Sequence, residues 1–220
     1  MEKEGKLKKH KILEPLSFKK PRYSKDLAEF AGIVMGDGGI SRRQITITLN
    51  RITDKEYIVF VARLIKKLFD VNPGINQNSQ YIADNIVVSR TGIVDFCAKE
   101  LGLKIGNKIR QQIDIPYWIK DNEKYYISCI RGLVDTDGSI IFHKYKSSGK
   151  YYCYKKLSYC SRSFPLLKSV GNIFKKLNIK HRFTKNNYEI RIESQKELAK
   201  YFDLIGSHNP KHLKRYENKV

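Results

Sequence analysis

The chain has few of the features that mark secreted, disulfide-stapled or membrane-spanning proteins. Its four cysteines, Cys97, Cys129, Cys153 and Cys160, show no CxxC spacing. This disfavours a zinc site and a disulfide scaffold, and it favours reduced thiols in a cytosol-like compartment. No uninterrupted apolar run reaches transmembrane length, and the lysine-rich N-terminus lacks the apolar stretch of a signal peptide. We therefore expect a cytoplasmic protein, or a protein of an organelle matrix if it is organelle-encoded, that is not secreted and has no membrane partner.

Acidic residues are scarce relative to basic ones. The 220 residues include 22 Asp and Glu but 43 Lys and Arg, so the formal net charge is +21. Hydrophobic residues make up 41%, which is enough for a folded core. A positive excess of this size repels itself unless a polyanion neutralises it, and nucleic acid is the usual polyanion. An anionic membrane surface is the weaker alternative.

The sequence contains an internal repeat. The segment FAGIVMGDGGI spans residues 30–40, and IRGLVDTDGSI spans residues 130–140. Gly32 aligns with Gly132, and Asp37 aligns with Asp137. The separation is too long for a solenoid repeat, so it indicates the duplication of one half-domain.

The periodicity of apolar residues predicts the same order of elements after both copies. The predicted elements are a strand at 43–50, a helix at 54–69 with Asp54 as its N-cap, a strand at 85–90, a helix at 91–101, a strand at 151–161, a helix at 164–177, a strand at 188–193 and a helix at 195–204. Each half is therefore expected to run helix, two strands, helix, two strands, helix. The polar segment 142–156 fits a mobile hairpin equally well.

These elements divide the chain into four parts. We expect a basic N-terminal arm at 1–22, a first half at 23–112, a linker at 113–122 and a second half at 123–220. Pro116 breaks regular structure in the linker, and Asp121 or Asn122 can cap the helix that follows. The two halves are expected to form one pseudo-symmetric unit. The arm is interpreted either as a solvated tail or as a segment that runs along a DNA backbone.

The repeated segments place small residues on one face of each predicted motif helix. Gly32 and Gly36 are four residues apart in helix 27–37, and Gly132 and Thr136 are four apart in helix 127–137. Small residues at this spacing let two helix backbones approach closely. Each glycine costs a helix roughly 1 kcal/mol, and packing of the two helices against each other would explain that cost.

Each motif helix is predicted to end in an aspartate that precedes a glycine cap, Gly38 or Gly138. Asp37 and Asp137 would thus lie beside the negative end of a helix dipole and close to each other. Two carboxylates and several carbonyls at one point form an oxygen-only cage suited to a hard divalent cation. A single Asp-Gly pair is usually a surface turn, whereas two matched copies on a basic chain favour the metal site.

Two histidines near the C-terminus have the spacing of helix-borne metal ligands. His208 and His212 are four residues apart, but Pro210 lies between them and no cysteine is near. We therefore interpret them as surface histidines near phosphates.

The two segments resemble the LAGLIDADG motifs of the homing endonuclease family, in its single-chain, two-motif form. Residues 130–138 match closely, and residues 30–38 match except that Met35 replaces the first acid. The resemblance covers most of 24–214, including IDIPYWI before the second motif and GSHNPKHLKRY near the end. It implies an α+β fold of duplicated αββαββα halves, which pack through the motif helices and place antiparallel, saddle-shaped sheets on DNA.

The resemblance also implies a function. A site-specific double-stranded DNA endonuclease would hydrolyse phosphodiesters with divalent metal at a long asymmetric site. Asp37 and Asp137, with the carbonyls of Gly36 and Thr136, would hold Mg²⁺. Mn²⁺ would substitute, and Ca²⁺ would support binding without efficient cleavage. Lys108 and Lys211 follow the last helix of each half and are the candidate basic catalytic residues, with Arg110 and Lys214 behind them.

The polar faces of the strands are expected to read base pairs in the major groove, where donor and acceptor patterns distinguish all four pairs. The candidate readers are Arg42, Gln44, Thr46, Thr48 and Asn50 in the first half, and Lys180, Arg182, Thr184, Arg191 and Glu193 in the second. A merely solvated sheet face is the alternative for each of them.

Two other functions stay open on the same fold. One is a maturase that binds its host intron RNA, and the other is a non-catalytic DNA-binding regulator. Because the two non-identical motif helices can satisfy each other within one chain, we expect a monomer. We also expect the protein to be encoded by an intron or an independent gene.

Overall fold

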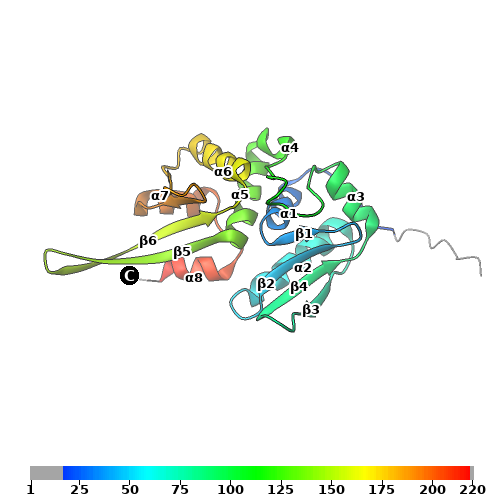
Figure 1. Cartoon of the computed structure of the whole chain (residues 1–220), viewed down its shortest axis with the longest axis horizontal. Coiled ribbons are helices and arrows are strands. Elements are labelled where there is room, and N and C mark those ends of the chain that lie inside the picture. Colours follow the sequence, from blue (N-terminus) through cyan, green and yellow to red (C-terminus); the bar gives the residue numbers. More distant parts are fainter. Residues whose placement is uncertain (1–16, 219–220) are drawn as a thin grey trace, which may run out of the picture.

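The computed structural model describes residues 17–218, which form two halves of similar construction (Figure 1). The first half consists of α1 (Lys25–Met35), β1 (Gly38–Ile40), β2 (Ile45–Asn50), α2 (Lys55–Phe69), β3 (Gly74–Gln77), β4 (Ala83–Val88) and α3 (Thr91–Lys99). The second half consists of α5 (Glu123–Asp137), β5 (Gly138–Ser147), β6 (Lys150–Cys160), α6 (Phe164–Lys176), β7 (Arg182–Phe183), β8 (Glu189–Ile192), α7 (Gln195–Leu204) and α8 (Pro210–Glu217). The predicted α+β order of two αββαββα halves is confirmed. Residues 1–16 of the predicted basic arm lie outside the described residues.

Two helices lie outside the predicted pattern. The short helix α4 (Tyr117–Lys120) follows Pro116 in the predicted linker, and α8 follows the last predicted helix. Asn122, one of the two predicted caps, accepts a hydrogen bond from the Lys124 N–H at the start of α5. In the same way Asn209 accepts from the Lys211 N–H and starts α8, which has proline in its first turn.

Each half contains one four-stranded antiparallel sheet, with the order β1-β2-β4-β3 or β5-β6-β8-β7. Alternation along the strands explains which face is buried. Ile45, Ile47 and Leu49 of β2 are buried, whereas Thr48 and Asn50 are exposed. Ile190 and Ile192 of β8 are buried in the same way. Each sheet therefore packs one face against the helices of its own half and leaves the opposite face open.

The motif helices α1 and α5 pack against each other at the centre of the molecule (Figure 1). A Cβ atom on Gly32 would overlap the Cys129 carbonyl oxygen, and one on Gly132 would overlap the Glu29 carbonyl oxygen. Gly36 lies equally close to the Thr136 side chain. The backbone-to-backbone packing predicted from the small residues is confirmed.

Gly138 stands at the predicted C-cap of α5, where its N–H donates to the Val134 carbonyl oxygen, whereas Gly38 does not cap α1, whose C-cap is Gly36. Gly138 is extended, with φ −93°, so it is not a left-handed helix cap. A Cβ atom at Gly38 would overlap the backbone of Val34, and one at Gly138 would overlap the Val134 carbonyl oxygen. Glycine is required because the first strand of each half starts against the last turn of its motif helix. Helix α1 also ends at Met35, two residues before the predicted end, so Asp37 lies in the following turn.

The packing of α1 and α5 leads to a prediction with an unusual sign. Replacing glycine with alanine inside a helix normally stabilises it by roughly 1 kcal/mol. Because the Gly132 position faces the Glu29 backbone, we expect Gly132→Ala to lower the free energy of unfolding by about 3 kcal/mol. Urea titration measures this change. Gly39→Ala is the matched control, since a Cβ atom there meets nothing within 4 Å. An unchanged or higher stability for Gly132→Ala would contradict the close packing.

Candidate functional site

Asp37 and Asp137 come together where the two motif helices end. Asp37 lies two residues after the end of α1, and Asp137 is the last residue of α5. The two ends are adjacent, because a Cβ atom on Gly36 would touch Thr136 and lie 3.4 Å from Oδ2 of Asp137. The structure thus brings together the four residues predicted to surround a metal.

The electrostatics of this point favour a cation. Burial raises the pKa of Asp37, and the nearby Lys108 offsets part of that rise. Burial, followed by the charge of Asp37, raises the pKa of Asp137 to about 7. Two carboxylates in a low-dielectric site disfavour each other's ionised form unless a proton or a positive ion compensates them.

Lys108 lies against the same helix end. Its Nζ donates to the carbonyl oxygens of Val34 at 3.5 Å and Met35 at 3.0 Å, and also to that of Gly36. A positive charge at this position complements the negative end of the α1 dipole. Burial lowers the pKa of Lys108, and the charges of Asp137 and Asp37 counter that effect.

Lys211 is held differently. Its Nζ lies 2.7 Å from Oδ1 of Asp54, whose side chain is only 6% exposed. Asp54 stands at the predicted N-cap of α2, but its side chain makes no capping hydrogen bond. Its carboxylate instead accepts from Nδ2 of Asn209 at 2.7 Å, across to the second half. Lys211 is nevertheless close enough to lower the pKa of Asp37. Of the two residues behind these lysines, Arg110 is exposed and Lys214 pairs with Glu56 at 3.0 Å.

A buried polar cluster beside the metal-site acids was not predicted. Asp135, the first acid of the second motif, is fully buried and accepts from the Ser207 hydroxyl and from the His208 N–H at 2.8 Å. Glu29 of α1 lies 3.2 Å from Arg131 and 2.6 Å from Nδ1 of His208. Burial raises the pKa of Asp135 to about 7. These contacts hold residues 207–209 against both motif helices. In the sequence, only the acid at position 135 of the second motif pointed to this cluster.

The prediction of two surface histidines is wrong for His212. This side chain is 2% exposed, and burial lowers its pKa to about 4. His208 is 43% exposed, but its ring bonds to Glu29. Helix α8 packs against β5 and buries His212, and a four-residue spacing around a proline cannot reveal that contact.

The donors at this point fit a divalent cation. Carboxylate and carbonyl oxygens are the ligands that hard cations such as Mg²⁺ prefer. The Thr136 hydroxyl is engaged inside α5, where it donates to the carbonyls of Gly132 and Leu133, so backbone carbonyls would complete the set. The Gly36 carbonyl also accepts from Lys108, so a bound cation would share that oxygen with the lysine. Among residues 17–218, no group of three or more His, Cys, Asp or Glu side chains forms an alternative cluster.

The open face of the first-half sheet carries uncharged polar groups. Nε2 of Gln44 donates to Thr46 at 3.1 Å, and the Thr48 hydroxyl donates to Asn85 at 2.8 Å. Oδ1 of Asn50 accepts two N–H groups of the turn that follows, each at 2.9 Å. Arg42 is exposed in the turn between β1 and β2.

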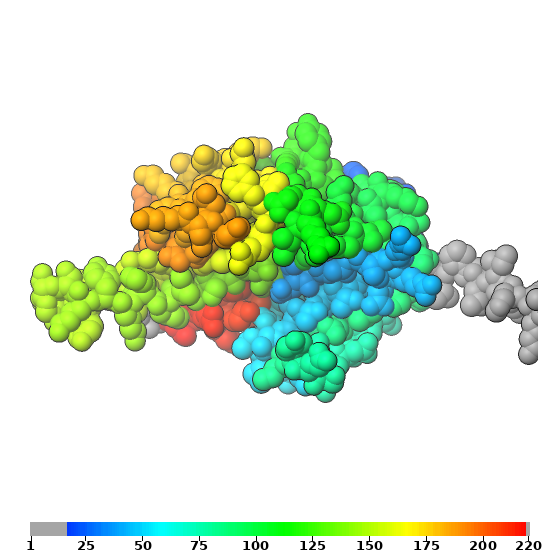
Figure 2. All heavy atoms as spheres, in the orientation of Figure 1, coloured from blue at the N-terminus to red at the C-terminus, as the bar shows by residue number. Residues whose placement is uncertain are grey.

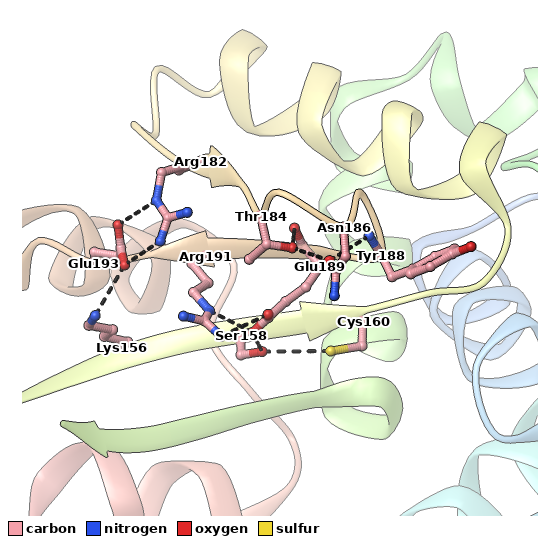
Figure 3. Close-up of polar contacts among 10 residues, drawn as sticks. All are labelled: Lys156, Ser158, Cys160, Arg182, Thr184, Asn186, Tyr188, Glu189, Arg191 and Glu193. Carbon is pink, nitrogen blue, oxygen red and sulfur yellow. Dashed lines mark hydrogen bonds and ion pairs between the residues drawn. The ribbon is translucent and has the colours of Figure 1, made fainter.

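The corresponding face of the second half carries ion pairs (Figure 3). Arg182 donates from two nitrogens to Glu193, both at 2.9 Å, and Lys156 lies 3.1 Å from the same carboxylate. The hydrogen bond from Arg182 lowers the pKa of Glu193 to about 2. Arg191 pairs with Glu189 in the same two-pronged way, at 2.7 and 2.9 Å. Lys156, Ser158 and Glu189 of this face were not predicted.

The remaining candidate readers lie at the far edge of that face. The Thr184 hydroxyl donates to Asn186 at 2.6 Å, and Lys180 is exposed. A groove connects the second-half face to the metal-site acids, and its lining includes Gly36, Lys108, Asp137, Cys160, Asn186 and Glu189. Lys211 lines a separate groove with Lys214 and Arg215.

Comparison with known proteins agrees with this architecture. The family described as the LAGLIDADG-like domain matches residues 124–206. The solved structure of I-DmoI in complex with DNA and Mn is 18% identical and covers 83% of this chain and 96% of that chain, with a TM-score of 0.55. A mutant of I-SmaMI is 11% identical and covers 90% and 89%, with a TM-score of 0.58. The LAGLIDADG homing endonuclease I-LtrWI, bound to target DNA, is 14% identical and covers 88% of each chain, with a TM-score of 0.55.

A curated relative extends the comparison. An uncharacterized protein of Methanocaldococcus jannaschii is 25% identical over 162 residues, which are 72% of this chain and 56% of that protein. The chain thus spans a little over half the length of this relative.

The protein is therefore an α+β protein with the fold of LAGLIDADG homing endonucleases, a family of metal-dependent DNA endonucleases. The resemblance to this family that the two motifs indicate is confirmed. No helix between residues 17 and 218 combines the length and the apolar composition needed to cross a bilayer.

The raised pKa of Asp137 predicts how stability depends on pH. The ordinary pKa of 3.8 rises to about 7 in the folded protein, so the unfolded state releases this proton first. The ionised carboxylate therefore lowers stability as pH rises from about 4, and its full cost is reached above about pH 7. We expect Asp137→Asn to be more stable than the wild type in metal-free buffer, by a margin that grows between about pH 5 and pH 8.

Thermal melting with a chelator present measures this margin at each pH. The control is Asp203→Asn, which changes an exposed carboxylate and should shift the melting temperature equally at both pH values. A constant margin for Asp137→Asn would mean that the folded site does not disfavour the carboxylate charge.

Proposed function

We propose that this protein is a monomeric homing endonuclease that cleaves both strands of double-stranded DNA at a long, asymmetric site. The proposal rests on one observation above all: Asp37 and Asp137 meet at the ends of two packed helices, beside Lys108 and between two open sheet faces. The relatives with this fold support it, because I-DmoI is described in complex with DNA and Mn, and with DNA and Ca.

Asp37 and Asp137 would hold divalent metal with the carbonyls of Gly36 and Thr136. Mg²⁺ is the proposed ion, Mn²⁺ would replace it, and Ca²⁺ would support binding with little cleavage because its looser geometry positions water less well. When bound, the metal supplies an activated water and stabilises charge on the phosphate. Lys108 would orient the scissile phosphate, since its ammonium group lies at the carbonyls that end α1 and is close enough for the charges of both acids to raise its pKa.

The net charge of +21 would draw the duplex onto the sheets. The first-half face would read bases through amides and hydroxyls, and the second-half face through the paired Arg182 and Arg191. Selection of cleaved sites from a randomised duplex library, followed by sequencing of the cut ends, would identify the target and test the proposal directly.

Replacing either aspartate should separate cleavage from binding. Asp37→Asn and Asp137→Asn each remove a metal-binding oxygen charge, so we expect loss of double-strand cleavage in Mg²⁺. Duplex binding should persist or tighten, because a carboxylate that faces phosphate is gone. The assay is linearisation of a supercoiled plasmid that carries the selected site, with Asp203→Asn as the control. Linearisation at the wild-type rate by either single variant would remove the basis of the metal-site proposal.

The two lysines should differ in effect. Lys108→Met is expected to slow cleavage about 100-fold with little change in duplex affinity. Lys211→Met leaves the buried Asp54 without its cation, so it should lower the free energy of unfolding by about 3 kcal/mol. Single-turnover kinetics and urea titration distinguish the two effects, with the exposed Lys168→Met as the control. The opposite pattern would assign the catalytic position to Lys211 and a structural role to Lys108.

The ion pair between Arg182 and Glu193 predicts that replacing either residue changes the base preference at the same positions of the target. Arg182→Ala should relax the preference at one or two base pairs by about 1–3 kcal/mol. Because Glu193 holds Arg182 with two hydrogen bonds, Glu193→Gln should relax the preference at the same positions, but less. Binding to a library of single-base-pair variants measures both, and Lys175→Ala on the outer surface of α6 is the control. A change at other positions would show that Glu193 contacts a base itself.

A further inference from the structure

The strands β5 and β6 form a long ribbon that projects from the body of the second half (Figures 1 and 2). Their pairing runs without a break from Gly138↔Tyr159 to Ser147↔Lys150. Among the described strands, β8 pairs with β6 only from Leu157 to Cys160, so the outer part of the ribbon extends beyond the sheet. The first half has no equivalent, since β1 contains three residues and β2 six.

One face of this ribbon is a ladder of aromatic rings. His143 pairs across the strands with Tyr154, and Tyr145 pairs with Tyr152. The Tyr145 and Tyr152 rings stack with centroids 5.2 Å apart, and the His143 and Tyr154 rings lie 5.1 Å apart. We call these four residues the aromatic face. Alternation places it on the same side as Lys156 and Ser158, so it continues the open face of the sheet.

The ribbon carries only positive charge. Residues 138–160 include five lysines and no Asp or Glu. Within residues 17–218, Lys144, Lys146 and Lys150 have no acidic partner, whereas the neighbouring sheet face pairs its arginines with Glu189 and Glu193. Strand pairing places Lys150 on the same side as the aromatic face, and Lys144 and Lys146 on the opposite side of the ribbon. An unneutralised basic ribbon is complementary to a polyanion.

The exposed rings favour a single strand over a duplex as the ligand of the ribbon. Bases in a duplex already stack on each other, so exposed ring faces can stack only on unpaired bases. Phosphates of a duplex need lysines but no aromatic ladder. Tyr145 and Tyr152 remain 43% and 44% exposed despite their mutual stacking, which leaves ring surface for a ligand.

We propose that the β5–β6 ribbon binds single-stranded nucleic acid, with unpaired bases stacked on the aromatic face and phosphates held by Lys150 on that side and by Lys144 and Lys146 from the opposite side of the two-stranded ribbon. This site goes beyond the proposed cleavage of duplex DNA and does not depend on it. Its ligand is a single strand, whether DNA or RNA.

The test measures binding of the full chain to labelled single strands of about 12 nucleotides, without divalent metal. The strands are oligo(dT), oligo(U) and an abasic DNA strand that keeps its phosphates but has no bases. We expect tighter binding to oligo(dT) or oligo(U) than to the abasic strand. Tyr145→Leu/Tyr152→Leu should weaken binding to the strand with bases by about 10-fold or more and remove this preference.

Two further variants keep the result interpretable. Tyr145→Phe/Tyr152→Phe retains the rings and should bind like the wild type. Tyr81→Leu/Tyr117→Leu removes two exposed tyrosines away from the ribbon, 69% and 78% exposed, and should also bind like the wild type. A larger loss for oligo(U) than for oligo(dT) assigns the strand as RNA, and the reverse assigns it as DNA.

Three results would overturn the proposal. The first is equal binding of abasic and base-containing strands, which would reduce the site to phosphate attraction. The second is wild-type affinity of the Leu variant for single strands. The third is an equal loss of affinity of the Leu variant for a duplex of the same length, which would make the ribbon a duplex contact. Since no cleavage or target site enters the assay, these results are independent of the proposed endonuclease activity.

Discussion

The contact between the backbones of α1 and α5 sets the position of everything else in the molecule. Gly32 and Gly132 allow each helix to touch the carbonyl groups of the other, which no side chain would permit. Packing this close brings both helix ends to one point, and therefore brings Asp37 and Asp137 together. Since Gly38 and Gly138 start the first strands directly against those ends, the two sheets spread from the same point (Figure 1).

The same closeness creates an electrostatic problem that the surrounding residues partly solve. Burial raises the pKa of both acids, and the charge of Asp37 adds to the rise at Asp137. Lys108 compensates at the carbonyls of α1, and Lys211 compensates through Asp54. The remaining cost of ionising Asp137 is what a bound cation would relieve. A site of this kind sacrifices some stability of the metal-free protein for affinity toward the ion.

The repeat made most of this architecture predictable from the sequence. Small residues four apart predicted the helix contact, and alternation predicted the buried faces of β2 and β8, because both are local patterns with one dominant cause. The buried hydrogen bonds of Asp54 and Asp135 and the burial of His212 were not predictable, since they involve segments distant in the chain. The pairing of Glu193 with Arg182 and Lys156 likewise depends on strand register, which periodicity does not specify.

The two halves share the same order of helices and strands but differ in the polar groups on the open faces of their sheets. The first-half face offers amides and hydroxyls that hydrogen-bond to each other, and such groups reorient at little cost to meet a new partner. The second-half face holds its guanidinium groups in two-pronged ion pairs, which fixes their geometry before any ligand arrives. In the acid-free ribbon beyond it, Lys144, Lys146 and Lys150 have no acidic partner within residues 17–218. Duplication therefore preserved the glycines and acids that the helix contact requires, while the faces, which that contact does not constrain, diverged in charge and rigidity.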